Sequence, residues 1–173
     1  MKIDFGQMIS ALSDMLDLVG IDEVQHGKRV GFMLWELARV MGMDGDSQKD
    51  LYRMGLLHDC GVSSTHVHKN LVGEMDWRES RLHCEIGADR LRNFPPLSFM
   101  SDVILHHHTH WEDLKKTDLP EHVKRSANLI FLSDRVDALA AHHLGVNLLE
   151  VKNDIREKIG ELRHSFFTRS RDS

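Results

Sequence analysis

The sequence predicts an all-α fold, arranged as a single domain and a helical bundle of about seven helices. Apolar residues recur at intervals of three and four along most of the 173 residues, the spacing that places them on one face of a helix. No stretch of any length alternates β-branched and polar residues as a half-buried strand would. The hydrophobic share of 41% suffices for one packed core, and the length is too short for two comfortable domains.

Two helices are expected in the first quarter of the chain. The first covers residues 5–19, where the apolar positions follow the three-four spacing, and it ends at Gly20. The second begins with Asp22 as its N-cap, because a short carboxylate side chain can accept the unpaired N–H groups of a first helical turn. Its apolar stripe continues to Val40 and is broken by Gly42.

The middle of the chain predicts two more helices separated by a long loop. Ser47, with Asp50 three residues later, resembles the start of a helix that ends at His58. Residues 61–78 are polar, contain two glycines and show little periodicity, so we expect a loop there. Helical spacing returns over residues 79–93.

The last part of the chain predicts three further helices. The consecutive prolines at 95–96 stop the preceding helix, and Ser98 is expected to cap the next one, which leads into a run of histidines. Residues 112–119 are polar and are expected to form a second loop. Pro120 suits the first turn of a long helix, and residues 148–162 carry the apolar pattern of a final one.

Composition narrows the class of protein. The formal net charge of −5 argues against a protein that holds DNA or RNA duplexes by charge. The two cysteines, Cys60 and Cys84, are too few for a disulfide scaffold and favour a reducing compartment. No apolar run approaches the ~18 residues of a membrane span, and no signal peptide is evident at Met1. We therefore expect a cytoplasmic protein, and its unusual feature is a count of 13 histidines.

The order of histidines and aspartates along the chain predicts a metal site. Imidazole and carboxylate are common transition-metal ligands, although a single histidine is more often a surface or core residue than a ligand. Neighbouring residues on a helix point about 100° apart, so an adjacent pair is not expected to chelate one small metal but can reach two. Asp59 can bridge such a pair of metals, as carboxylates do in two-metal sites. The candidates, which fall on five separate helices, are His26, His58, Asp59, His83, His107, His108 and Asp134.

This order resembles the HD superfamily of metal-dependent phosphohydrolases, in particular the HD-GYP branch that hydrolyses cyclic dinucleotides. The resemblance covers roughly residues 20–145. It divides the chain into an N-terminal helix over 1–20, a metal-binding core over 21–145, and a C-terminal helix and tail over 146–173. The segments that carry the resemblance are residues 25–30 (QHGKRV), 56–61 (LLHDCG), 83–88 (HCEIGA), 104–111 (ILHHHTHW) and 132–139 (LSDRVDAL).

The resemblance implies two divalent transition metals, most often iron or manganese in the family. The implied ligands of the first metal are His26, His58, Asp59 and Asp134. Asp59 would bridge to a second metal, whose other implied ligands are His83, His107 and His108. This register places Trp111 where the family carries a tryptophan, and the pair 106–107 is the alternative. Asp22 stands where some members use a glutamate for a third metal.

The sequence departs from the family at two places. Val62 replaces the lysine of the family's His-Asp-x-Gly-Lys motif, and residues 112–119 contain neither the glycine nor the tyrosine of the Gly-Tyr-Pro motif. Two function hypotheses follow. The first is a phosphodiesterase that hydrolyses a cyclic dinucleotide or related nucleotide phosphoester through a metal-bridging hydroxide, with Asp59 as catalytic residue. The second is a catalytically degenerate signalling module that binds nucleotide or protein partners.

Several further residues have more than one interpretation. Four basic residues are either phosphate contacts or solvated surface charges: Lys69, Lys115, Lys116 and Arg135. The two cysteines lie beside proposed ligands and are expected to pack as small apolar groups, with sulfur ligation as the alternative. The first and last helices lie outside the motifs, and they either pack the ends of the domain or join a second copy or an attached domain.

Overall fold

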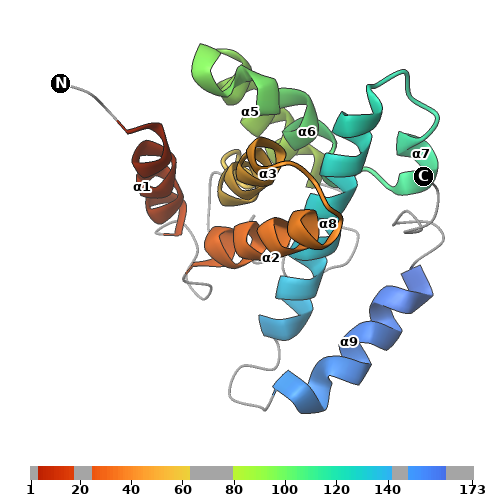
Figure 1. Cartoon of the computed structure of the whole chain (residues 1–173). Helices are drawn as coiled ribbons and strands as arrows, with labels where there is room; N and C mark the ends of the chain where they lie inside the picture. Colours follow the sequence, from red (N-terminus) through yellow and green to blue (C-terminus); the bar gives the residue numbers. More distant parts are fainter. Residues whose placement is uncertain (1–3, 18–24, 63–79, 142–147, 163–173) are drawn as a thin grey trace.

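All regular structure is helical in the part of the chain that the computed structural model describes, which comprises residues 4–17, 25–62, 80–141 and 148–162 (Figure 1). The all-α prediction is therefore confirmed. The elements in chain order are α1 (Phe5–Asp17), α2 (His26–Val40), α3 (Gly45–Leu57), α5 (Ser80–Arg92), the 3-10 helix η1 (Pro95–Met100), α6 (Ser101–His106), α7 (Trp111–Leu114), α8 (Glu121–Ala141) and α9 (Leu148–Leu162).

Two of these elements were not expected, because both are too short for periodicity to reveal. The prolines at 95–96 follow the end of α5, as expected, and they also open the 3-10 helix η1. The predicted loop over 112–119 contains the single turn α7. Most of the predicted loop over 61–78 lies outside the described residues.

The predicted start of the second helix was wrong. Helix α2 begins at His26, and Gln25 before it has a left-handed backbone with φ of 69°, which interrupts any helix arriving from Asp22. Asp22 itself lies outside the described residues. The consequence is that His26 occupies the first position of α2.

The predicted caps of α3 and α6 were also wrong. Asp44 caps α3, and its Oδ1 accepts the backbone N–H groups of Asp46 and Ser47 at 3.0 Å each. Ser47 lies in the first turn and donates its hydroxyl to Asp44 Oδ2. Ser98 lies inside η1 and donates its hydroxyl to the Pro95 carbonyl, so α6 begins three residues later than its predicted cap.

Helix α8 is the central element of the bundle (Figure 1). It contacts α2, α3, α6 and α9, and its buried residues face the core on several sides. Leu34 of α2, Ile104 of α6 and Ile130 of α8 are fully buried in one apolar cluster. Helix α1 contacts α2 and α3 through that cluster, where its Ile9 is also fully buried. The division of the chain at residues 20 and 145 stays a prediction.

Helices α2 and α3 approach each other at glycines. A Cβ atom on Gly55 would lie 2.6 Å from the Cα atom of Gly31, closer than real side chains come to a backbone. A second close approach joins the turn after α3 to α5, where a Cβ on Gly61 would lie 1.8 Å from the carbonyl oxygen of His83. These contacts bring the end of α3 against both α2 and α5.

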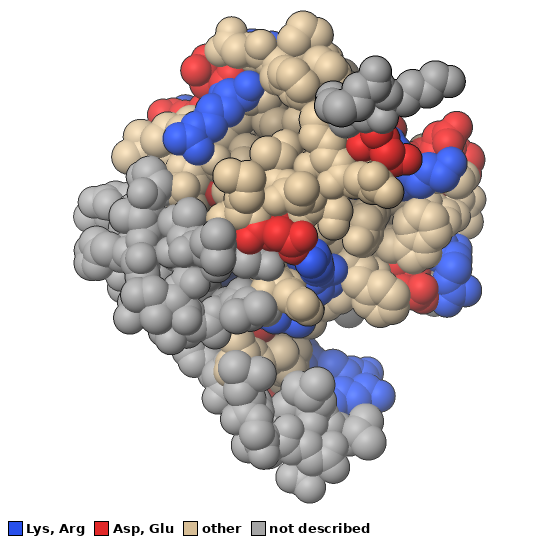
Figure 2. Space-filling view, turned by 90° about the vertical axis from the view of Figure 1, so that its left-hand side faces the viewer, with Lys and Arg blue, Asp and Glu red and all other residues tan. Residues whose placement is uncertain are grey.

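The described surface carries neighbouring charges of opposite sign. Figure 2 shows Lys and Arg side chains next to Asp and Glu side chains on one face. On α7 and the turn after it, Lys115 pairs with Glu112 and Lys116 with Asp113. These exposed ion pairs contribute little to stability. Among the described residues, no helix combines the length and the apolar character needed to cross a membrane.

Candidate metal centre

The seven predicted residues meet at the centre of the bundle. They come from the start of α2, the turn after α3, α5, the turn after α6, and the middle of α8. They form two groups, and within each group one imidazole nitrogen or carboxylate oxygen from every residue lies within 4.8 Å of those of the others. The first group is His26, His58 and Asp134, and the second is Asp59, His83, His107 and His108.

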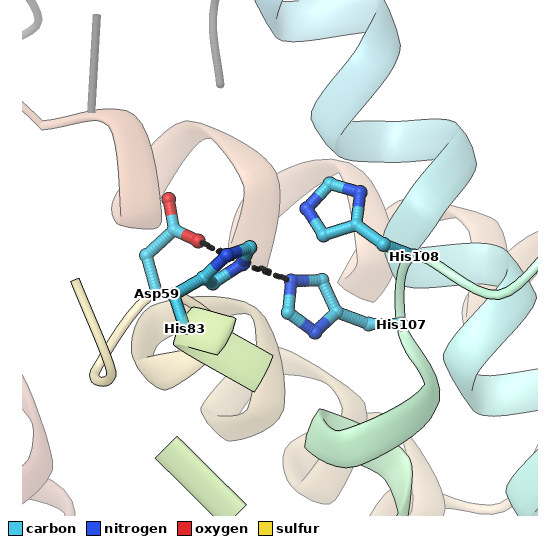
Figure 3. Close-up of side chains that lie close together, drawn as sticks. All are labelled: Asp59, His83, His107 and His108. Carbon is cyan, nitrogen blue, oxygen red and sulfur yellow. Dashed lines mark hydrogen bonds and ion pairs between the residues drawn. The ribbon is translucent and has the colours of Figure 1, made fainter. Parts of the chain in front are cut away.

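Asp59 is a member of the second group, but its carboxylate faces both groups. Its Oδ2 is 3.7 Å from His26 Nε2 and 3.5 Å from His58 Nε2. Its Oδ1 is 3.5 Å from His83 Nε2 and 3.9 Å from His107 Nε2 (Figure 3). One carboxylate thus presents one oxygen to each group, which is the arrangement of a bridging ligand.

The adjacent histidines 107 and 108 fall in the same group, contrary to the expectation from helical geometry. Helix α6 ends at His106, so both residues belong to the turn after it and the 100° rule for neighbouring helical side chains does not apply. Their ring centroids are 4.3 Å apart (Figure 3). His106 stays outside both groups, near Thr109, which favours the register 107–108 over 106–107.

Backbone and side-chain acceptors fix the orientation of three imidazoles. His58 Nδ1 lies 2.8 Å from the Gly55 carbonyl, and His107 Nδ1 lies 2.7 Å from the Ile104 carbonyl. A carbonyl oxygen can only accept, so Nδ1 is the donor in both rings and Nε2 of the neutral ring carries the lone pair. His26 Nδ1 in the same way donates to Asp137 Oδ2 at 2.8 Å. All three rings therefore point Nε2 into the centre.

The centre holds more electron-donating atoms than hydrogen bonds can satisfy. Asp59 Oδ1 is buried and has no hydrogen-bond partner. The Nε2 atoms of His26 and His58 lie 3.3 Å apart, as do those of His83 and His107. Buried polar atoms without partners are costly, whereas imidazole nitrogen and carboxylate oxygen bind divalent transition metals well. The donor set therefore fits two such metals.

At one end of the centre, the neighbouring carboxylates favour the protonated forms of the histidines. Burial lowers the pKa of His26, but hydrogen bonds with Asp134 and Asp137 outweigh it, and the pKa is held well above its usual value. Burial lowers the pKa of His58 as well, but the charge of Asp59 and the hydrogen bond and charge of Asp134 together hold it above its usual value. A metal bound here would displace these protons.

The histidines at the other end of the centre are neutral. Burial lowers the pKa values of His83 and His108, and together with the neighbouring histidines it lowers that of His107 to about 3. Burial alone would raise the pKa of Asp59, but the surrounding histidines hold it below its usual value. At neutral pH this end therefore combines neutral imidazoles with an ionised carboxylate, the forms in which both bind metal.

Sequence reasoning missed Asp137 and Arg29. Asp137 accepts from His26, and it also accepts from Arg29 Nε at 2.7 Å and Nη2 at 2.9 Å. The signal was in the spacing, because Asp134 and Asp137 are one turn apart on α8, and His26 and Arg29 are one turn apart on α2. Arg135, expected as a phosphate contact or a surface charge, is buried and donates to Asp134 Oδ2 at 2.7 Å.

The other candidates lie at the margin of the centre or beyond it. Cys84 Sγ is 3.6 Å from His83 Nε2 and from His107 Nδ1 but belongs to neither group. Cys60 is half-buried, and burial raises the pKa of its thiol to about 12. Val62 is buried, with 6% of its surface exposed. Asp22, the third-metal candidate, and Lys69 lie outside the described residues.

The fold and this centre agree with the sequence comparisons. The profile of the HD domain family matches residues 24–145, and the chain belongs to that family. Proteins of this family bind divalent metals. A curated relative named 3'3'-cGAMP-specific phosphodiesterase 1, from Vibrio cholerae serotype O1, is 36% identical over 172 residues, which is 97% of this chain and 40% of the relative. The chain thus spans about two fifths of that relative's length. No solved structure matches the chain.

Proposed function

We propose that this chain is a metal-dependent phosphodiesterase domain of the HD-GYP type, which hydrolyses a cyclic dinucleotide. The observation that carries the proposal is Asp59, whose two oxygens face two separate groups of ligand atoms. Two-metal sites of this kind serve phosphodiester hydrolysis in many enzymes. The 36% identity to a protein named as a cyclic-dinucleotide phosphodiesterase supports the same reaction.

In this proposal each group holds one divalent metal. His26, His58 and Asp134 hold the first and His83, His107 and His108 hold the second, while Asp59 bridges them. The mixture of nitrogen and oxygen donors suits iron or manganese and also admits zinc. A third metal beside Asp22 stays a prediction, as does a second copy or an attached domain at the first and last helices.

When bound, the metals would supply a water nucleophile with a pKa near about 7 and a clamp on the phosphoryl oxygens. The chain's own residues provide the geometry. Gly55 and Ile104 orient the rings of His58 and His107 through their carbonyls, and Arg135 orients Asp134. Two ligand carboxylates against two divalent cations leave excess positive charge, which attracts an anionic phosphodiester. Attack of the water oxygen forms one P–O bond as the bond from phosphorus to a ribose oxygen breaks, and the departing ribose oxygen takes up a proton, which opens the dinucleotide ring.

The substrate proposed is 3'3'-cGAMP, and it rests on the likeness to the relative. Residues 112–119 lack the glycine and tyrosine of the family's Gly-Tyr-Pro motif. An altered motif in this position is compatible with a mixed guanine–adenine substrate instead of cyclic di-GMP.

Val62 favours the alternative hypothesis of a module that binds nucleotide without turnover. Its side chain is buried and has no charge to offer a phosphoryl oxygen, where the family's motif has a lysine. The complete set of clustered ligands favours the enzyme, because an unused buried site of this kind would be costly to keep.

The test is metal content together with turnover. The purified chain is loaded with Mn²⁺ or, anaerobically, with Fe²⁺. It is then assayed by chromatography on 3'3'-cGAMP, cyclic di-GMP and bis-p-nitrophenyl phosphate. We expect two metals per chain and linear product from 3'3'-cGAMP. Asp59→Ala should lose both metals and all turnover, whereas Asp50→Ala, a half-buried aspartate on α3 that lies outside both groups, should behave as wild type.

The outcomes separate the hypotheses. A wild-type chain that binds no metal would contradict the ligand assignment. Two metals without turnover of any of the three substrates would support the signalling module. Normal metal content in Asp59→Ala would show that Asp59 does not bridge.

A further inference from the structure

Asp137 connects an arginine to one of the candidate ligands. It lies one turn beyond Asp134 on α8 and is buried, with 5% of its surface exposed. It accepts from His26 Nδ1 at 2.8 Å and from two nitrogens of Arg29 at 2.7 and 2.9 Å. The planar fork of the guanidinium fixes the carboxylate plane, and the carboxylate in turn fixes the imidazole.

The supporting contacts differ between the two groups. In the first group, the acceptor of the His26 ring is a carboxylate that an arginine holds in place. His107 of the second group donates to a neutral backbone carbonyl, as His58 of the first group does, and the buried His83 Nδ1 has no hydrogen-bond partner. The carboxylate acceptor of His26 is therefore the contact that differs. A carboxylate acceptor makes an imidazole a stronger metal ligand than a neutral acceptor does, and it also restricts the rotation of the ring.

We propose that Asp137, held by Arg29, is a positioning residue that selectively strengthens metal binding by the group of His26, His58 and Asp134. The inference rests on the proposed two-metal function. It adds that the two metals depend on different supporting residues, so one can be weakened while the other is retained. Asp137 is not a ligand, because its Oδ2 faces Nδ1 of His26, on the side of the ring away from the centre.

The test measures Mn²⁺ binding, which does not depend on turnover. Wild type, Asp137→Asn, Arg29→Gln and Asp50→Asn are freed of metal with a chelator and titrated with Mn²⁺, with free Mn²⁺ followed by electron paramagnetic resonance. Asp50→Asn is the matched control, because Asp50 also accepts from an arginine, Arg53, but is itself more exposed than Asp137 and lies outside both groups. Circular dichroism of the chelator-treated variants verifies that each is folded.

We expect two bound Mn²⁺ in wild type and in Asp50→Asn. In Asp137→Asn the affinity for one Mn²⁺ should fall by about 10- to 100-fold while the other is unchanged, as for supporting residues of metal ligands in general. Arg29→Gln should show a smaller loss in the same ion. Adding Asp137→Asn to His26→Ala should cause little further loss, but adding it to His108→Ala should cause the full loss.

Three results would overturn the inference in different ways. Unchanged affinities in a folded Asp137→Asn would show that Asp137 does not support metal binding. Equal weakening of both ions would show that its effect is not selective. A wild-type chain without bound Mn²⁺ would overturn the two-metal function, and this inference with it.

Discussion

Replacing Gly61 by alanine should push α5 away from the turn that carries Asp59. A Cβ atom at this position would lie 1.8 Å from the His83 carbonyl oxygen and 2.6 Å from the Gly87 backbone nitrogen. Both atoms belong to the backbone of α5, so no flexible side chain can move aside. The carbonyl must retreat by about 1.2 Å to reach even 3.0 Å, below which such contacts are essentially absent from proteins.

The displacement acts on stability and on the metal centre together. Overpacking of this kind costs about 1–3 kcal/mol or more, which in a chain of this size lowers Tm by roughly 2–12 °C. The His83 ring moves with α5, so its distance of 3.5 Å from Asp59 Oδ1 should increase. Displacements of about 1 Å in such sites can cost on the order of 100-fold in rate.

The assay combines thermal unfolding in chelator, followed by circular dichroism, with Mn²⁺ titration at a temperature where the variant is folded. Gly160→Ala is the control, because nothing lies within 4 Å of its added Cβ on the exposed face of α9. It should stabilise the helix by up to about 1 kcal/mol. If Gly61→Ala melts with wild type and binds Mn²⁺ equally well, the close approach of α5 to this turn is refuted.

Three further predictions concern the centre and its surroundings. Mn²⁺ at 100 times its Kd should raise the free energy of unfolding by about 2.7 kcal/mol for each site. The measurement is the rise in Tm over the chelator-treated protein, and an unchanged Tm would contradict two buried sites. Arg135→Gln should lower Mn²⁺ affinity by about 10- to 100-fold, because Arg135 holds Asp134 through its Oδ2, and Lys124→Gln on the same helix is the control. Burial raises the pKa of the Cys60 thiol to about 12 and that of the Cys84 thiol further. Ellman's reagent at pH 8 should therefore label neither thiol in the native chain and both in denaturant. Rapid labelling of the native chain would refute the burial of these thiols.

Helices α2, α3 and α8 were predictable because each buries an apolar stripe. The pattern over residues 79–93 gave α5 to within one residue at each end. Helix starts were less predictable, because several nearby side chains can cap and their relative positions decide which one does. Ser47 has a suitable hydroxyl, but Asp44 three residues earlier accepts two backbone N–H groups, and the helix begins there. The left-handed Gln25 was invisible in the sequence, because its conformation depends on the surrounding packing.

The clustering of the seven candidate residues was predictable from their order and the resemblance they carry, but the residues that support them were not. Ligands recur as residue types with metal chemistry, whereas Asp137 and Arg29 act through His26 and have no distinctive local motif. Their spacing becomes informative only once Asp134 and His26 are placed on facing sides of α2 and α8. Charged residues one turn from a predicted ligand are therefore worth testing as its hydrogen-bond partners.

Two adjacent pairs of residues reach the centre from the ends of helices. His58 and Asp59 directly follow α3, and His107 and His108 directly follow α6. In each turn the first histidine is held by the carbonyl three residues earlier, in the helix that has just ended. The second residue differs between the two turns: His108 joins His107 in one group, whereas Asp59 presents one oxygen to the group of His58 and the other to the second group.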